Sequence, residues 1–408
     1  MMPAGVAPEA RLLLIGRALR AFTDGFVAIL LPAYLLALGL GIWEVGLIST
    51  ATLLGSALMT LAVGQWGHRY PQRRLLLAAA WLMAITGLLL AGFSSFWPLL
   101  IVAFIGTMNP SSGDVSVFLP LEHARLAETA QADLRTAIFA RYTFVGALFA
   151  AFGALASAIP DLLANNGFTQ LDALRAMFVL YGATGVAIFF LYRRLPAVQT
   201  HEQTTPPTQQ AALGPSRAIV VRLAALFSLD AFAGGLLVNT LLALWLFERF
   251  DLSLAAAGHF FFWAGLLSAG SQLAAPWVAR RIGLINTMVF THIPSSICLI
   301  LAAFADSLPV ALALLFMRSA LSQMDVPTRS AFVMAVVTPA ERAAAASFTA
   351  VPRSLAAAAS PAIGGAMLAA GWLATPLVAC GALKIAYDLA LFVSFRRHEK
   401  RASQKASS

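Results

Sequence analysis

The sequence predicts an all-α membrane protein with twelve transmembrane helices, arranged as two pseudo-symmetric bundles of six helices each. Three observations lead to this fold class. Hydrophobic residues make up 60% of the 408 residues and charged residues only 11%, which leaves too few polar side chains to cover a soluble surface. The apolar residues form twelve long stretches, and a polar interruption in the first half of the chain recurs in the second half.

The twelve stretches are long enough to cross a membrane, because a bilayer core of about 30 Å requires roughly 20 residues at 1.5 Å each. The predicted spans are 15–38, 43–66, 75–93, 97–119, 137–159, 173–191, 221–246, 254–278, 285–305, 309–336, 343–370 and 375–395. The segment 196–216 is rich in Pro, Thr and Gln and is predicted to be a soluble linker. It divides the chain into an N-terminal half (1–195) and a C-terminal half with a short basic tail (217–408).

Arginine and lysine residues gather in the connections on one side of the predicted membrane, as expected for the side that faces the cytoplasm. They flank the linker, fill the C-terminal tail and lie in the loops that follow the second, fourth, eighth and tenth spans. The connections on the other side carry almost none beyond Arg175 and Arg249. We therefore predict an integral protein of the cell (inner) membrane with both termini and the linker in the cytoplasm.

The polar interruption indicates an internal duplication. The stretch from Gly106 to Arg125 and the stretch from Arg318 to Arg329 both place Asp-Val before a proline region and a basic residue. Other landmarks recur at a similar offset, and the matched pairs are Asp114 with Asp325, Asp24 with Asp230, Arg69 with Arg281, and Arg135 with Arg342. Because each half holds an even number of spans, the halves are predicted to be parallel repeats about an axis along the membrane normal.

The loop between the second and third predicted spans carries a motif. Its sequence GQWGHRYPQRR, from Gly64 to Arg74, resembles the signature G-x-x-x-D-R-x-G-R-R/K of the major facilitator superfamily of secondary transporters. The first glycine, the first arginine and the arginine pair match, whereas His68 replaces the acidic residue and Pro71 the second glycine. The resemblance implies a transporter that moves a small-molecule substrate through the lipid bilayer by alternating access between its two halves.

The same resemblance predicts a cytoplasmic gate. In the family, the acidic residue of this loop joins a charge cluster that latches the cytoplasmic side, and this chain lacks that acid. Asp114 and Asp325 are candidates to supply the carboxylates instead, since Asp114 lies roughly 25 Å along the fourth span from its start. The predicted gate consists of Arg69, Arg73, Arg74, Asp114, Arg281, Asp325 and Arg329. The alternative is that the two carboxylates contact the substrate.

Ionisable residues inside the spans are the candidates for transport, because charge is costly in lipid and persists only with a partner or a wet cavity. Asp24 and Asp230 occupy equivalent places in the first and seventh spans, and a desolvated carboxylate there can take up and release a proton. The alternative is a structural role as a buried partner of Arg20 or Arg222. Three arginines complete the set of candidates for substrate binding or proton coupling: Arg141, Arg318 and Arg353.

Other polar residues receive structural interpretations. Lys384 and Asp388 are spaced i, i+4 in the last span and are predicted to pair on one helix face. His292 is isolated in its span and is predicted to be packed rather than to bind a ligand.

The predicted function is secondary active transport with proton-coupled export (efflux) of small amphipathic compounds. The three intramembrane arginines support an alternative, which is transport of a small anionic metabolite. A non-transporting receptor or assembly factor is disfavoured, because the chain has no sizeable soluble domain. Enzyme motifs such as a phosphate loop, a His-Glu-x-x-His pair or a nucleophile elbow are absent, so no enzyme is predicted. We expect a monomer with protons and substrate as partners, and no cofactor, metal or nucleic acid.

Overall fold

The computed structural model describes residues 8–111, 116–128, 135–196, 214–338 and 341–406. All regular elements in these ranges are helices. The chain divides into two compact units. Unit one comprises Met1–His201 and Val238–Gly265, and unit two comprises Glu202–Leu237 and Leu266–Ser408.

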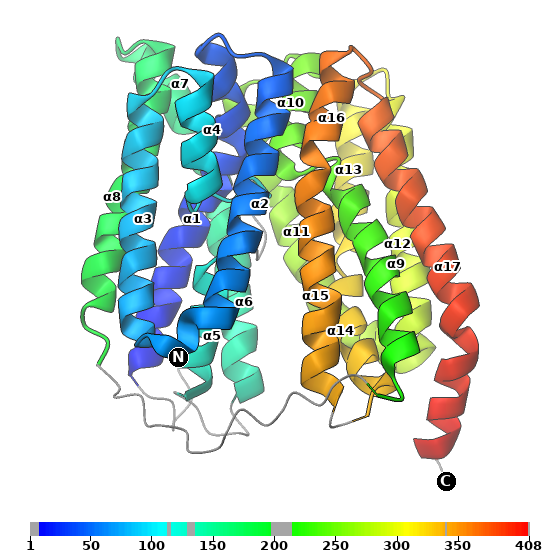
Figure 1. Ribbon diagram of the computed structural model, residues 1–408. Helices are drawn as coiled ribbons and strands as arrows, with labels where there is room; N and C mark the ends of the chain where they lie inside the picture. Colours follow the sequence, from blue (N-terminus) through cyan, green and yellow to red (C-terminus); the bar gives the residue numbers. More distant parts are fainter. Residues whose placement is uncertain (1–7, 112–115, 129–134, 197–213, 339–340, 407–408) are drawn as a thin grey trace. The chain divides into compact units, whose positions relative to one another are not determined.

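Unit one is built around its first helix. Helix α1 packs against α6, α8 and α10, while α3 lies along α8 and α2 along α4 (Figure 1). The helices of unit one are α1 (Glu9–Ala37), α2 (Ile42–Trp66), α3 (Gln72–Gly92), α4 (Phe96–Ile105), α5 (Phe118–Glu128), α6 (Arg135–Leu155), α7 (Ile159–Asn165), α8 (Gln170–Tyr192), α10 (Asn239–Phe250) and the first part of α11 (Leu254–Ile282), with short 3-10 turns η1 (Gly67–Arg69) and η2 (Ala156–Ala158).

Small residues let α1 and α6 approach closely. A Cβ atom added at Gly153 would lie 1.9 Å from the carbonyl oxygen of Phe22, and one added at Gly25 would lie 2.1 Å from that of Ala150. No side chain larger than glycine fits at these two positions without displacing a helix. In a membrane, where water does not drive helices together, such close backbone contact is a main source of helix association.

In unit two, α9 packs against α15 and α17, and α12 packs against α13, α14 and α17 (Figure 1). Phe227, Met288, Phe332 and Tyr387 form part of the apolar core that these helices share. The helices are α9 (Arg217–Gly235), the second part of α11, α12 (Leu284–Ala303), α13 (Leu308–Ser322), α14 (Asp325–Val336), α15 (Arg342–Ala359), α16 (Pro361–Ala369) and α17 (Thr375–Ala406).

Nine helical stretches among the described residues are long and apolar enough to cross a membrane. They correspond to all the predicted spans except the fourth, tenth and eleventh. Each of those three is divided into shorter helices, α4 and α5, α13 and α14, and α15 and α16. The predicted spans at these places are therefore interrupted helices, and so is the seventh, between α9 and α10. Proline explains three of these breaks, since Pro110, Pro327 and Pro361 lie at or just after them and remove backbone donors.

The interruption after α4 exposes backbone groups that the start of α10 satisfies. The Oγ1 and backbone N–H of Thr240 both donate to the carbonyl oxygen of Pro110, at 3.0 Å and 3.1 Å. The side-chain amide of Asn239 donates to the carbonyl oxygen of Ser111 at 2.9 Å. A broken helix is tolerated at membrane depth when neighbouring groups satisfy its free carbonyls in this way.

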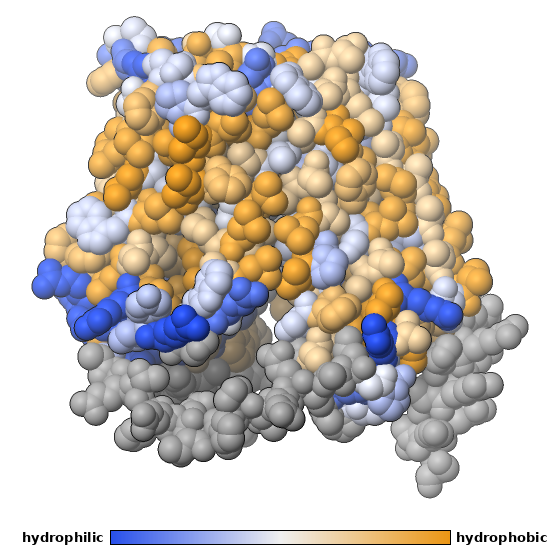
Figure 2. Space-filling view, viewed as in Figure 1, coloured by the Kyte–Doolittle hydropathy of each residue, from blue (hydrophilic) through white to orange (hydrophobic). Residues whose placement is uncertain are grey.

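Large apolar side chains are exposed on both units. Figure 2 shows hydrophobic residues over the middle of the visible helices and hydrophilic residues gathered towards the helix ends. Trp97 of unit one is 71% exposed, and Val393 of unit two is 80% exposed. Such a surface suits a lipid surrounding, where apolar side chains need no cover.

Candidate functional site

The buried charges of unit two meet in one network around Asp230 of α9. Its Oδ2 atom accepts a hydrogen bond from Nη1 of Arg329 on α14 at 3.0 Å. Its Oδ1 atom accepts one from Nζ of Lys384 on α17 at 2.6 Å. One carboxylate therefore joins three helices of the unit through two cations.

Arg329 extends the network along α14. Its Nη2 atom lies 3.4 Å from Oδ2 of Asp325, one turn earlier on the same helix, and its guanidinium lies over the ring of Phe227 at 5.5 Å. Asp325 begins α14, where the partial positive charge of the helix N-terminus favours a carboxylate. Pro327 sits in the same first turn, where a missing N–H costs no internal hydrogen bond.

His292 of α12 connects the network to a further carboxylate on α17. Its Nδ1 atom lies 3.0 Å and 3.1 Å from the two carboxylate oxygens of Asp388. Its Nε2 atom lies 3.4 Å from Nζ of Lys384 and 3.9 Å from Oδ1 of Asp230. The structure therefore corrects two interpretations from the sequence. Lys384 bonds to Asp230 rather than to Asp388, and His292 is not isolated but holds Asp388.

Changing a single member of this network is expected to reduce the stability of the protein. Removing one partner of a buried ion pair typically costs 3–5 kcal/mol, because the other charge is left uncompensated, whereas replacing the whole pair by apolar residues is often neutral. A network of six ionisable side chains is thus not needed for the stability of a helix bundle. This favours a functional reason for its presence.

Unit one contains a second buried cluster, centred on Glu122 of α5. Arg20 of α1 forms an ion pair with Glu122, and the hydroxyl groups of Tyr142 and Tyr192 donate to the same carboxylate. The guanidinium of Arg20 also lies over the ring of Phe118 at 4.2 Å. The sequence analysis did not assign a role to Glu122, although it lies within the polar stretch from Gly106 to Arg125 that marked the duplication.

Equivalent helices of the two units carry opposite charges in the two clusters. In unit one the first helix carries the cation and the helix after the break in the fourth span carries the anion, Arg20 and Glu122. In unit two the corresponding helices carry Asp230 and Arg329. Asp24 is buried on α1, and Arg17 and Arg20 both act on it electrostatically.

The predicted arginines are not hydrogen-bonded members of either cluster, although the charge of Arg353 acts on Arg329, Asp230 and Asp325 of the unit-two network. Arg141 on α6 and Arg318 on α13 are partly buried, and Arg353 on α15 is exposed. Arg141, Arg318 and Arg353 form no ion pair with a carboxylate in the part of the chain that the structure describes. They remain candidates for binding an anionic group.

The residues of the predicted gate fall into separate places. Arg73 donates to the carbonyl oxygen of Arg193 at the end of α8 at 2.6 Å, while Arg69 and Arg74 are exposed. Arg281 lies over the ring of Trp277 at 4.1 Å. The contact between Asp325 and Arg329 is the ion pair described above, and Asp114 lies outside the described residues. The gate itself stays a prediction.

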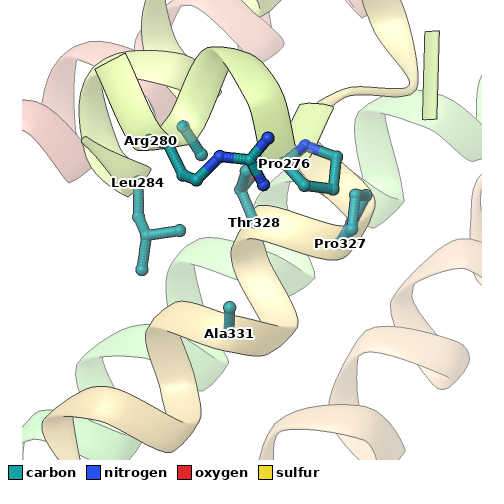
Figure 3. A pocket seen from close by; sticks show the side chains of 7 residues that line it. Pro276, Arg280, Leu284, Pro327, Thr328 and Ala331 are labelled. Atoms are coloured by element: carbon teal, nitrogen blue, oxygen red, sulfur yellow. The ribbon is translucent and has the colours of Figure 1, made fainter. Parts of the chain in front are cut away.

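A pocket of about 280 Å³ lies between α11, α12 and α14 of unit two. Its charged lining residue is Arg280, whose side chain extends toward Pro276 and Thr328 (Figure 3). The lining residues are Pro276, Ala279, Arg280, Leu284, Pro327, Thr328 and Ala331. Thr328 precedes Arg329 directly, so the pocket adjoins the helix turn that carries a cation of the network.

The apolar helices and the buried ion pairs among them define an integral membrane protein. Residues 13–323 match the Major Facilitator Superfamily, and the chain belongs to this family of transporters. The predicted fold class of two pseudo-symmetric six-helix bundles is thereby confirmed, as is the resemblance read from the loop motif.

Similar proteins extend over nearly the whole chain. An uncharacterized membrane protein of Saccharomyces cerevisiae, YJR124C, is 24% identical over 410 residues and covers 92% of each chain. The crystal structure of the nucleoside transporter NupG has a TM-score of 0.74 and 15% identity, covering 95% of this chain and 99% of that chain. A D-xylose–proton symporter has a TM-score of 0.75 and 17% identity, covering 94% and 96%. At these identities the two structures show a shared fold, and both are transporters rather than enzymes.

Proposed function

We propose that this transporter exports small amphipathic compounds and that proton movement drives the export. The observation that carries the proposal is the buried carboxylate Asp230, held between Arg329 and Lys384. Protonating a carboxylate in such a network removes its charge and weakens both ion pairs. The helices α9, α14 and α17 are then free to shift, which is what alternating access requires.

Asp24 is proposed as the corresponding carboxylate of unit one. It is buried on α1, one turn after Arg20, and this helix is the one around which unit one packs. The proposal also places the protein in the inner membrane with cytoplasmic termini and linker, following the distribution of basic residues. The predicted gate of arginines with Asp325 would close the cytoplasmic side in this arrangement.

The similar structures leave the cargo open. One carries nucleosides and the other xylose by name, and their similarity to this chain is nearly equal. The amphipathic cargo therefore rests on the apolar composition and the buried acids of this chain. A second candidate, transport of a small anionic metabolite, is favoured by three arginines within the spans that form no ion pair among the described residues, Arg141, Arg318 and Arg353.

Flux into proteoliposomes under an imposed pH gradient tests both candidates, with cationic dyes and organic anions measured in parallel. Export of amphipathic compounds predicts dye movement that depends on the gradient and is lost in Asp24→Asn and Asp230→Asn. The matched control is Asp251→Asn, because Asp251 is an exposed carboxylate in the loop after α10. Anion uptake that is lost in Arg141→Ala or Arg353→Ala, without dye movement, would overturn the proposal in favour of the second candidate.

A further inference from the structure

His292 is enclosed by ionisable groups from two other helices, α9 and α17. It is 3% exposed, and its partner Asp388 is 0% exposed. The ring nitrogens face Asp388 on one side and Lys384 with Asp230 on the other. The ring also meets Tyr387 edge to face, with the ring centroids 6.1 Å apart. Neither the fold nor the two ion pairs of Asp230 require an imidazole at this position.

The partners of His292 determine where its proton lies. An ionised carboxylate only accepts hydrogen bonds, so the Nδ1 atom that faces Asp388 carries a hydrogen. An ammonium only donates, so the Nε2 atom that faces Lys384 offers its lone pair. The geometry therefore assigns the neutral imidazole with hydrogen on Nδ1 to this state. Lys384 donates to both Asp230 and His292.

The side chains linked to one another by these ion pairs carry one excess negative charge when His292 is neutral. They comprise three carboxylates, Asp230, Asp325 and Asp388, and two cations, Arg329 and Lys384. The remaining helix packed against α12 is α13, whose charged residue Arg318 joins no ion pair in the described chain. The cysteines Cys298 and Cys380 lie on α12 and α17. Arg353, on α15, makes no direct contact with this cluster in the described chain, although its charge acts on Arg329, Asp230 and Asp325. One added proton balances the contact cluster.

We infer that His292 and Asp388 form a proton-binding site. When this site binds a proton, it repels Lys384 and so weakens the ion pair between Lys384 and Asp230. This inference rests on the proposed proton coupling and adds an earlier step to it, in which the proton binds His292 before the ion pairs of Asp230 change. The incoming proton forms an N–H bond with the lone pair of His292 Nε2, and Asp388 stabilises the resulting imidazolium. The reverse step breaks the same N–H bond and returns the proton to water, so one proton enters and one leaves in each cycle.

Protonation changes the partners of Asp230. The new imidazolium stands 3.4 Å from the ammonium of Lys384, and the two like charges repel. Lys384 loses its acceptor on the ring, while the new N–H points at Oδ1 of Asp230, 3.9 Å away. The link between α9 and α17 through Lys384 weakens, whereas the link between α9 and α14 through Arg329 stays. Protonation of His292 thus weakens the contact of α9 with α17 and leaves its contact with α14 in place.

Nuclear magnetic resonance of the full-length protein in lipid nanodiscs, with ¹⁵N-labelled histidine, tests the proton site directly. The His292 signals are assigned by their loss in His292→Gln, and the control is His259→Gln, which removes an exposed histidine. We expect the Nδ1–H tautomer at high pH and a single protonation as the pH falls. The pH of this protonation should change in opposite directions in Asp388→Asn and Lys384→Met, since the first variant loses an attraction and the second a repulsion. A ring that never titrates between pH 4 and 9, or a titration that neither variant moves, overturns the inference.

The flux assay separates this inference from the proposed function. His292→Gln should retain exchange of the transported dye or anion across the membrane while losing its accumulation against a concentration gradient. Equal accumulation in His292→Gln and wild type overturns the role of His292 even if transport is proton-driven. If wild type moves no probe under a pH gradient, the proposed function fails, and the histidine titration still decides whether the proton site exists. A variant that fails to fold is recognised by its elution profile, and Asp388→Asn then provides the flux measurement.

Discussion

The cluster around Glu122 supports a quantitative prediction for the variant Glu122→Gln. This substitution keeps the shape of the side chain and removes its charge. Glu122 is 0% exposed and Arg20 is 2% exposed, so the guanidinium is left buried without its counter-ion. Breaking a buried pair in this way costs about 3–5 kcal/mol. The amide also has one oxygen in place of two, so one of the two tyrosine hydroxyl groups loses its acceptor.

The assay is thermal denaturation of the purified protein in detergent, followed by intrinsic fluorescence. A loss of this size lowers the midpoint of unfolding by roughly 10 °C for a unit of about 200 residues. The double variant Arg20→Met with Glu122→Gln should recover about half of the loss or more, because it removes both charges. Glu248→Gln, which changes an exposed carboxylate of the same unit, is the matched control. A midpoint for Glu122→Gln within about 2 °C of wild type would refute the reasoning, given this expected cost.

Two further predictions concern a helix cap and a helix contact. Glu341 accepts hydrogen bonds from Ser216 and Thr338 side chains at 2.6 Å each, which lowers its pKa to about 2. Its contribution to stability is therefore complete above its ordinary pKa of 4.5 and is lost as the pH falls toward 2. The midpoint of thermal unfolding should therefore fall less between pH 6 and pH 3 in Glu341→Gln than in wild type. An equal fall in both proteins would contradict this. At the α1–α6 contact, Gly153→Ala should destabilise by about 1–3 kcal/mol, whereas the control Gly270→Ala, with open space around its added Cβ, should be neutral or stabilising in the same assay.

Elements that depend on local sequence were predicted well. Helix α2 runs from Ile42 to Trp66 and was predicted at 43–66, and α8 runs from Gln170 to Tyr192 and was predicted at 173–191. A span is recognised from its own composition, because each residue must tolerate lipid whatever its neighbours are. The breaks in the fourth, seventh, tenth and eleventh spans were missed as helix ends. The breaks in the fourth and tenth spans fall in the polar stretches that mark the duplication, but the sequence does not show where each helix ends. In the fourth span, only the packing of α10 shows that the freed carbonyl groups have partners.

The candidate site was predicted in part. Asp230 was identified because an acid in an apolar span needs an explanation, and its equivalence to Asp24 came from the repeat. Its cation Lys384 was assigned to Asp388 instead, since a spacing of four residues on one helix is the nearest pairing that a sequence offers. In the structure Lys384 pairs with Asp230, 154 positions away. His292 and Glu122 received no function, because one polar residue in an apolar run carries no sign of what it faces.

The sequence by itself determined the class of this protein, the membrane as its solvent, the number of its spans, its family motif and the duplication of its halves. Those properties follow from composition, run length and repetition, each of which is readable without knowing which helices touch. Only the tertiary structure decided which charges meet, that Arg20 belongs to Glu122, and that His292 stands between Asp388 and Lys384. Pairing depends on which helix faces are brought together, and the free energy of a buried charge is set by groups within a few ångströms of it, wherever they lie in the chain.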